Sequence, residues 1–295
     1  MKNLPQAALA IALFTTVFTP RAQAQSEIPF HLVNGNLIVA TLVVADTDPV
    51  NSVPVSFILD TGADTTILDP SLAARLALSP LPPVHQTTLI GVRSLPRGLV
   101  PSLAAGSVQV DHLPVIVQDL AALRRLDAHI QGIAGQDFLS HFDYVLDYRR
   151  HVLRIEVASE IRDALEGDRV QIEPGSPRMI VAAQGQSLRT ATLRLVLDSG
   201  ASSLVLVRSG SQALDVPAFQ TVQETTSSGS TNLRLGKVHK LTIGSQQLHD
   251  IAVALSPIDP AEPIGDGLLP TTLFDVLYIN NREGFVVFNP RPHKN

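Results

Sequence analysis

A short acidic turn occurs twice in this chain, and each copy follows a run of apolar and β-branched residues. The first copy is Asp60-Thr61-Gly62-Ala63 and the second is Asp198-Ser199-Gly200-Ala201. The preceding stretches 55–59 and 193–197 also match, and each is typical of a strand that runs into a tight glycine turn. The chain is therefore interpreted as an internal duplication in which each half contributes one carboxylate.

The repeat continues beyond the two acids. The segment Phe142–Leu146 is similar to Phe274–Tyr278, and the same offset places Gly135 on Gly267. The offset between the acids is a few residues larger, as loop insertions normally allow. We expect the boundary between the copies in the polar stretch 160–169. The predicted division is an N-terminal lobe over residues 25–165, a C-terminal lobe over 166–290 and a tail over 291–295.

The pattern of both halves indicates β-structure. The stretch Ile28–Ala45 alternates around Asn34-Gly35, a dipeptide that favours a hairpin turn with positive φ. In the second half, Met179–Leu197 contains two strand-like runs, and we expect the turn between them at Gln184-Gly185-Gln186. Each of these regions leads into one of the acidic turns.

Helical signals are short and few. Asp69 is a suitable N-cap, and Pro70 a suitable first residue, for a turn that ends near Leu76. A second short helix is expected within Leu120–Leu126. Neither is long enough to set the fold, so we predict an all-β chain.

The first residues predict an export signal. Lys2 precedes an apolar stretch, Ala7–Phe18, and a small-residue cleavage motif, Ala22-Gln23-Ala24. Residues 1–24 are therefore interpreted as a signal peptide, and the mature chain is expected near Gln25 onward, in the periplasm or outside the cell. The alternative is a retained anchor, but the apolar stretch is shorter than the ~20 residues that span a bilayer.

Composition narrows the classes of function. The formal net charge is -5 and no long Lys/Arg run occurs, so nucleic acid is not expected as a partner. Aromatic residues make up only 4% of the chain and Trp is absent, which leaves little material for a stacking platform. With no cysteine, thiolate nucleophiles and Cys-ligated metals are excluded. The His residues are scattered without metal-site spacing, so no metal or other cofactor is predicted.

The paired acids suggest hydrolysis without a metal. Two carboxyl groups within hydrogen-bond distance share a proton, so that one acts as a base while the other acts as an acid. A water held between them could attack a carbonyl carbon. Each Gly permits a sharp turn beside its acid, and each Thr or Ser hydroxyl could donate to the opposite loop. The alternative is that both motifs are ordinary turns, but two matched copies favour the catalytic interpretation.

A family resemblance follows from these residues. Phe57–Leu68 closely resembles the active-site stretch of retropepsin-like aspartic peptidases, and Gly132–Leu139 resembles that family's second signature, two apolar residues and a Gly before a short helix. The corresponding stretch of the second half is Ile264–Pro270, in which Gly265 and Asp266 depart from the apolar pair and Gly267 is kept. The resemblance implies a bilobal acid-protease fold, a tandem version of what retroviral enzymes assemble from two identical subunits.

The resemblance also implies roles for individual residues. Asp60 and Asp198 would form the catalytic dyad, and Thr61 and Ser199 would supply interlocking hydroxyls. The remaining members of the two turns would support the dyad: Gly62, Ala63, Gly200 and Ala201.

Substrate contacts are implied less directly. Asp64 matches the family's acid that holds the substrate backbone, whereas Ser202 occupies the equivalent place in the second half. Flap hairpins are expected over His85–Leu103, with Gly91 and Gly98, and over Thr225–Leu235, with Gly229. Because only the first half carries an acid at the place of Asp64, the cleft should be asymmetric.

The resemblance implies an aspartic endopeptidase that binds a peptide or protein substrate, without stable membrane insertion after signal cleavage. Both acidic turns end in Ala, where pepsin-like enzymes carry a hydroxyl that donates to the carboxylate. Because such a donor lowers the pKa of a carboxyl group, we expect the dyad here to have a higher pKa and the activity to occur at weakly acidic pH. The rival hypothesis is a catalytically silent peptide-binding module with the same fold. A monomer is expected, because the linked lobes supply both halves of the site; the alternative is an assembly in which each lobe pairs with another chain.

Overall fold

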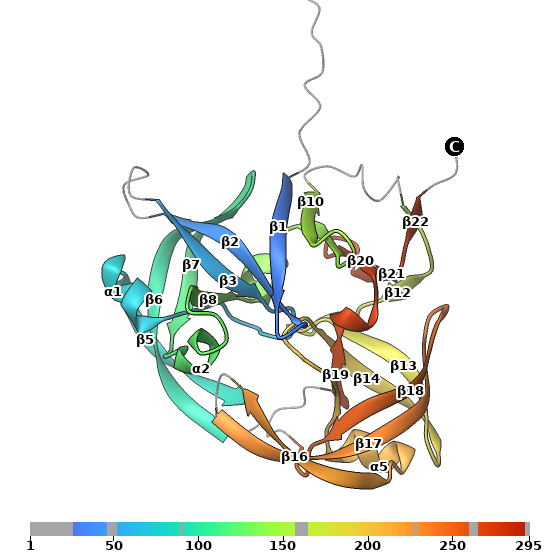
Figure 1. The fold of residues 1–295 in the computed structure, drawn as a ribbon. Coiled ribbons are helices and arrows are strands. Elements are labelled where there is room, and N and C mark those ends of the chain that lie inside the picture. The colour runs from blue at the N-terminus through green and yellow to red at the C-terminus, as the bar shows by residue number, and fades with distance from the viewer. Residues whose placement is uncertain are drawn as a thin grey trace, which may run out of the picture.

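Two β lobes meet along one shared sheet (Figure 1). The computed structural model describes residues 26–45, 52–88, 91–156, 165–226, 229–259 and 265–292. The predicted signal peptide, residues 1–24, lies outside these ranges. Among the helices that the structure describes, none is long and apolar enough to cross a membrane.

The shared sheet takes strands from both halves of the chain. Its order is β1–β10–β9–β20–β21–β12, with every neighbouring pair antiparallel. The hairpins β9–β10 and β20–β21 are equivalent parts of the repeat, so a pseudo-twofold axis passes between β9 and β20. The bounds are β1 Ser26–Val33, β9 Asp143–Asp147, β10 Val152–Glu156, β12 Arg169–Gln171, β20 Val276–Asn280 and β21 Phe285–Phe288.

The N-terminal lobe is a sheet that closes on itself. Strand β3 runs parallel to β8, β4 runs parallel to β7, and β2 pairs with β6. The strands are β2 Leu37–Ala45, β3 Val53–Leu59, β4 Ile67–Leu68, β5 Ser79–Thr88, β6 Gly91–Ala105, β7 Val108–Val117 and β8 Ile130–Ala134. The helices are α1 Pro70–Arg75, α2 Ala121–Arg124 and α3 Gln136–Leu139.

The C-terminal lobe repeats these pairings. Strand β14 runs parallel to β19, β15 runs parallel to β18, and β13 pairs with β17. The strands are β13 Ile180–Gln186, β14 Thr190–Asp198, β15 Leu204–Leu206, β16 Ala218–Thr226, β17 Gly229–Ile243, β18 Gln246–Leu255 and β19 Gly267–Pro270, with helix α5 Arg208–Leu214 and the 3₁₀ helix η2 Thr271–Leu273. The predicted all-β, bilobal fold is confirmed.

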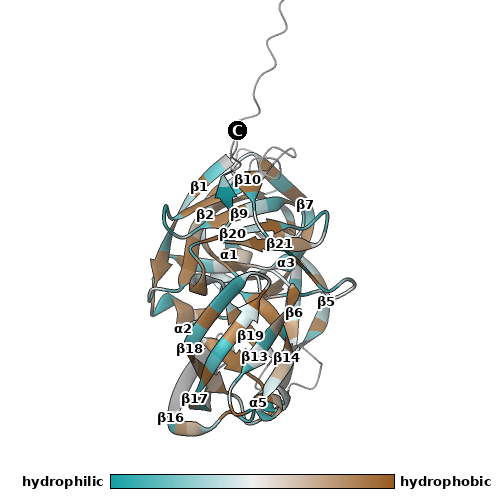
Figure 2. Ribbon diagram, turned by 90° about the vertical axis from the view of Figure 1, so that its right-hand side faces the viewer, coloured by the Kyte–Doolittle hydropathy of each residue, from teal (hydrophilic) through white to brown (hydrophobic). Residues whose placement is uncertain are grey.

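Local signals explain several of these elements. Asn34 and Gly35 have φ of 53° and 77°, so the predicted hairpin turn joins β1 to β2. Asp69 accepts a hydrogen bond from the backbone N–H of Ser71, which caps α1 as expected. Figure 2 shows hydrophobic and polar residues alternating along many strands of both lobes, as half-buried strands require.

The expected turn at Gln184–Gln186 is wrong. These residues lie inside β13, where Gly185 pairs with both Ala191 and Leu241, and the chain reverses at residues 187–189 instead. A Cβ at Gly185 would lie 2.8 Å from Leu214 Cδ1, so the glycine serves close packing between strand and helix α5. Gly185 therefore belongs to a strand and does not form a turn.

The alignment of Gly135 with Gly267 is also wrong. In the first half, Leu59 pairs with Ala134, whereas in the second half Leu197 pairs with Leu269 and Asp198 with Pro270. The counterpart of Ile133-Ala134-Gly135 is therefore Leu268-Leu269-Pro270, which keeps the apolar pair and replaces the glycine by proline. The departure attributed to Gly265 and Asp266 does not concern this signature.

Near the presumed boundary, β11 Leu165–Glu166 pairs with β22 Arg291–Pro292. Arg291 and Pro292, assigned to the tail from the sequence, thus belong to a strand pair. Residues 157–164 and 293–295 lie outside the described ranges, and the lobe boundaries stay predictions.

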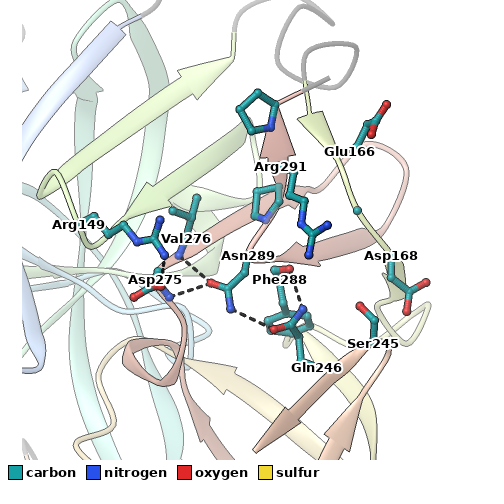
Figure 3. Close-up of a pocket in the computed structure, with 13 residues that line it drawn as sticks. Arg149, Glu166, Asp168, Ser245, Gln246, Asp275, Val276, Phe288, Asn289 and Arg291 are labelled. Carbon is teal, nitrogen blue, oxygen red and sulfur yellow. Dashed lines mark hydrogen bonds and ion pairs between the residues drawn. The ribbon is translucent and has the colours of Figure 1, made fainter. Parts of the chain in front are cut away.

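The dipeptide Phe-Asp occurs in both halves, at residues 142–143 and 274–275. Each Asp contacts an Arg from the other half, which explains the repeat in structural terms. Arg282 donates from Nε to Asp143 Oδ2 at 2.5 Å and from its backbone N to Oδ1 at 3.1 Å. On the opposite side of the pseudo-twofold axis, Arg149 forms an ion pair with Asp275 (Figure 3). The Asp143 side chain is 0% exposed and that of Asp275 is 55% exposed, so the two equivalent pairs differ in burial.

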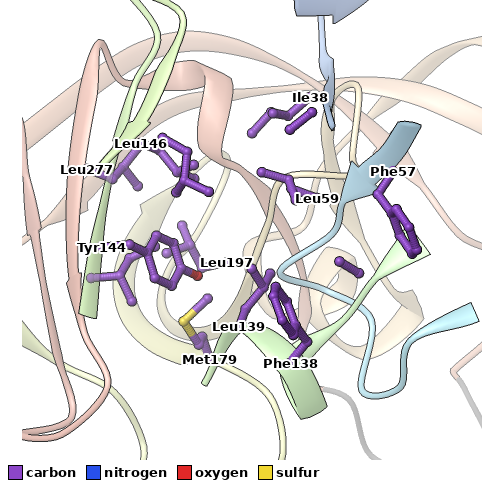
Figure 4. Close-up of a cluster of buried hydrophobic side chains, with 14 of the residues drawn as sticks. Ile38, Phe57, Leu59, Phe138, Leu139, Tyr144, Leu146, Met179, Leu197 and Leu277 are labelled. Carbon is purple, nitrogen blue, oxygen red and sulfur yellow. The ribbon is translucent and has the colours of Figure 1, made fainter. Parts of the chain in front are cut away.

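The hydrophobic core is continuous between the lobes. Leu59 and Leu197, which precede the two acids, belong to the same cluster as Tyr144 and Leu277 from the shared sheet. Figure 4 shows these side chains together with Met179, which belongs to the same cluster. The two turns are therefore supported by a single packed layer.

The unequal burial of the two Asp–Arg pairs leads to a prediction about stability. Arg282→Ala leaves a buried carboxylate without its guanidinium and should lower the free energy of unfolding by about 2–4 kcal/mol. Arg149→Ala, the equivalent change at an exposed pair, should lower it by less than about 1 kcal/mol. Urea denaturation of both variants measures this difference, and equal losses would contradict it.

Candidate active site

The two acidic turns meet at the interface between the lobes. Asp60 follows β3, and its N–H donates to Ala134 O of the neighbouring strand at 3.0 Å. Asp198 is the last residue of β14 and pairs with Pro270. The carboxyl group of each acid lies beside the glycine of the opposite turn, so the two carboxyl groups are neighbours. The structure thus brings together the two carboxyl groups that the sequence singled out.

Each turn holds its own carboxylate in place. The backbone N–H groups of Gly62 and Ala63 donate to Asp60 Oδ1 at 2.9 Å and 3.2 Å. The N–H of Gly200 donates to Asp198 Oδ1 at 2.7 Å. These donors fix the direction of both carboxyl groups before any substrate binds.

Hydroxyl groups connect the two turns reciprocally. Thr61 Oγ1 donates to Leu197 O at 2.8 Å and accepts from the N–H of Ser199 at 3.0 Å. Ser199 Oγ donates to Leu59 O at 2.7 Å and accepts from the N–H of Thr61 at 2.9 Å. Thr61 is 0% exposed and Ser199 1%, so these four bonds do not compete with water. They fix the position of one lobe relative to the other at the acids.

The glycines of both turns lie against the opposite acid. A Cβ at Gly62 would lie 2.4 Å from Asp198 Cγ, and a Cβ at Gly200 would lie 2.9 Å from Asp60 Cγ. Any side chain at either position would push the carboxyl groups apart. The glycine in each turn is therefore a requirement for close approach of the two acids.

The electrostatic setting favours a shared proton. Burial raises the pKa of Asp60, partly offset by the Gly62 and Ala63 donors. Burial and the neighbouring Asp60 charge raise the pKa of Asp198 well above its usual range. Ala63 and Ala201 have no hydroxyl to donate to either carboxylate. Because both pKa values are raised and the two carboxyl groups are neighbours, the pair favours a state in which one proton is held between them.

A polar network supports the first turn from behind. Gln136 Nε2 donates to Thr61 O at 2.9 Å. The hydroxyl of Thr66 donates to Asp137 Oδ1 at 2.6 Å and accepts from the N–H of Gly135 at 3.2 Å. Burial raises the pKa of Asp137 despite the Thr66 donors. Gln136 and Asp137 lie within the second signature, Gly132–Leu139, but their residue types alone predict no role for either.

The second turn lacks this network. Leu204 occupies the place of Thr66, and Pro270, which has no N–H, occupies the place of Gly135. Leu204 is 1% exposed and belongs to the core cluster. The first turn is thus supported by hydrogen bonds and the second largely by apolar packing.

Asp64 makes a contact that the sequence did not indicate. Arg178 of the C-terminal lobe donates from Nε to Asp64 Oδ1 at 2.6 Å and from Nη2 to Oδ2 at 2.8 Å. This bidentate pair adds a second connection between the lobes near the dyad. Ser202, the equivalent of Asp64, is exposed and uncharged, so the two ends of the site differ.

The expected flap segments form long hairpins. Gly91 pairs with Thr88 between β6 and β5, and Gly229 pairs with Thr226 between β17 and β16. Gly98 is buried farther down β6, where a Cβ would meet Leu78 Cβ at 3.0 Å. The connecting residues 89–90 and 227–228 lie outside the described ranges, and the substrate-binding roles of Gly91 and Gly229 stay predictions.

Other features give no competing site. Among the described residues, no group of three or more His, Asp or Glu side chains is arranged to hold a metal ion. A cavity of about 810 Å³ lies beside Arg149, Asp275 and Asn289 (Figure 3), but none of its lining residues belongs to the acidic turns. This cavity is therefore separate from the paired acids.

Comparison with known families supports the duplication. A family model described as aspartyl protease matches residues 49–138 and 184–273, which together make up more than half of the chain. Each match contains one acidic turn, and they end three residues after Gly135 and Pro270 respectively, in agreement with the strand register. A comparison with curated proteins found no match.

The reciprocal hydroxyl bonds predict a loss of stability on removing one hydroxyl. Thr61→Val leaves the buried Leu197 carbonyl and Ser199 N–H without their partner, which should lower the free energy of unfolding by about 2–4 kcal/mol. Thr61→Ser keeps the hydroxyl and should cost less than about 1 kcal/mol. Chemical denaturation distinguishes the two, and a Val variant as stable as the Ser variant would contradict the proposed contribution.

The raised pKa of Asp198 predicts a pH-dependent stability difference. Because the folded state retains this proton more strongly than the unfolded state, the associated stability is present below the unfolded pKa and is lost as pH rises through the folded pKa. Asp198→Asn does not titrate and should become increasingly more stable than the wild type from acidic to neutral pH. Unfolding free energies across this range provide the test, and a pH-independent difference would refute it.

Proposed function

Because the chain belongs to the aspartyl protease family, as two tandem retropepsin-like lobes, we propose that it is an aspartic endopeptidase whose dyad is Asp60 and Asp198. One observation carries the proposal: the two carboxyl groups are neighbours at the lobe interface, where the reciprocal bonds of Thr61 and Ser199 hold the two turns together. This arrangement supplies an acid and a base on either side of one water molecule.

In the proposed reaction, one of the two carboxyl groups acts as a base and the other as an acid. In this scheme Asp60 is the carboxylate that removes a proton from the attacking water. Asp198, whose pKa is raised by burial and by the neighbouring Asp60 charge, carries the proton that is donated to the carbonyl oxygen of the substrate. The tetrahedral intermediate then collapses: the C–N bond breaks, the amine nitrogen takes the proton that Asp60 removed from water, and one hydroxyl group of the intermediate returns a proton to Asp198 as the carbonyl group forms again. No covalent intermediate with the protein is needed.

The substrate is proposed to be an extended peptide that lies between the lobes. The hairpins β5–β6 and β16–β17 would pair with its backbone, while side chains fill apolar pockets. Asp64, oriented by Arg178, would contact the peptide at one end of the cleft only.

Two further features of the proposal rest on the sequence. We place the protein outside the cytoplasm, in the periplasm or secreted, because of the signal-like residues 1–24. We propose a monomer, since both acids are supplied by one chain. The rival hypothesis is a silent peptide-binding module. A departure from the signature at Gly265 and Asp266 would favour it, but in the strand register the counterpart of the signature is Leu268-Leu269-Pro270.

The activity is tested by incubating the mature protein with a diverse peptide mixture from about pH 3 to about pH 8. Asp60→Asn and Asp198→Asn should each lower the rate by about 10³-fold or more, because each removes one partner of the acid–base pair. Asp111→Asn, the same change at a side chain outside the site, should leave the rate unchanged.

The pH profile is a second readout of the same experiment. The rate should be greatest at weakly acidic pH and should fall as pH rises through the raised pKa of Asp198, because the proton donor is then lost. Full activity of either Asn variant would overturn the assignment of the dyad. Peptide binding without cleavage by the wild type would favour the silent module.

A further inference from the structure

Tyr148 of the N-terminal lobe reaches into the C-terminal lobe close to Asp198. It directly follows β9, and its N–H donates to Asp275 O at 2.9 Å. Its ring packs edge-to-face on Phe30 with a centroid separation of 5.8 Å. The backbone and ring are therefore fixed by contacts in both lobes, and the hydroxyl has a defined direction.

The hydroxyl of Tyr148 is hydrogen-bonded to Oγ1 of Thr271. Thr271 is 0% exposed and begins η2. The preceding residue, Pro270, is the strand partner of Asp198. The bond from Tyr148 thus fixes the residue at which the chain bends away from the second acid.

The equivalent place in the first half is supported in another way. Gln136 directly follows Gly135, the counterpart of Pro270, and its side-chain amide donates to Thr61 O within the first acidic turn. Thr271 stands at this position in the second half, and its hydroxyl is held from the other lobe. In each half, the residue at this position therefore carries a buried polar side chain, and in the second half that side chain is bonded to a residue of the opposite lobe.

We propose that Tyr148 is a positioning residue for Asp198, which acts through Thr271 across the lobe interface. The inference rests on the proposed peptidase function. Tyr148 does not contact the scissile bond, and its contribution is to hold the β19–η2 bend in place and keep water away from the second carboxyl group.

The electrostatic surroundings are consistent with a role for the neutral hydroxyl. Burial and the nearby Asp198 charge raise the pKa of Tyr148, so the phenol keeps its proton throughout the working range. The charged groups that act on the dyad are the two acids themselves and Asp64, whose charge raises the pKa of Asp60. Tyr148 adds no charge to this set.

The test compares Tyr148→Phe and Thr271→Val with a matched control. Each should lower kcat about fivefold to tenfold with little change in KM, because one buried hydrogen bond beside the acid is lost. The double variant should be no slower than either single variant. Tyr278→Phe removes another buried hydroxyl of the shared sheet, which is bonded to Asn280 at 3.0 Å, and should leave kcat and the pH profile unchanged.

A carboxyl titration measured by carbon NMR makes the test independent of turnover. In Tyr148→Phe, water should enter beside Asp198 and relieve its burial, so the pKa of Asp198 and the upper limb of the pH–rate profile should both move to lower pH. Urea denaturation confirms that the variants are folded. If the wild type cleaves no peptide, the proposed function fails, while the NMR titration still decides the role of Tyr148. An unchanged titration and kcat in both single variants would overturn the inference.

Discussion

The site depends on the exchange of hydrogen bonds between Thr61 and Ser199. Two buried carboxyl groups repel each other when both are ionised, and burial alone would favour structures in which they separate. Four short hydrogen bonds between the turns oppose that separation. Because each hydroxyl both donates to and accepts from the opposite loop, neither turn can move without breaking bonds in the other. The hydrophobic core shared by the lobes and the Asp64–Arg178 ion pair also hold the two lobes together around the acids.

The sequence predicted the features that local patterns determine. The acidic turns, the hairpin at Asn34-Gly35 and the cap at Asp69 follow from residue types at fixed spacing, and the structure contains all three elements. The errors at Gly185 and Gly267 have a common cause. Glycine marks close approach as well as turns, and only the strand register shows that Gly267 lies against Val205 O, where a Cβ would be 2.0 Å away.

The partners of the site residues could not be predicted in the same way. Arg178 lies far from Asp64 in the sequence, and no spacing rule relates them. The same holds for Tyr148 and Thr271, which meet only because β9 and β20 pair at the centre of the shared sheet. Such contacts are set by how two lobes pack, and an internal repeat indicates that the lobes exist without giving the register between them.

The difference between Asp64 and Ser202 has a consequence for how this molecule can change over time. In an assembly of two identical subunits, one substitution alters both ends of the binding site at once. Here the pseudo-twofold axis relates residues that are encoded separately, so the charged end that contains Asp64 and Arg178 can be altered while the other end keeps its preference. In the proposed peptidase, selectivity on either side of the scissile bond would thereby be free to evolve alone.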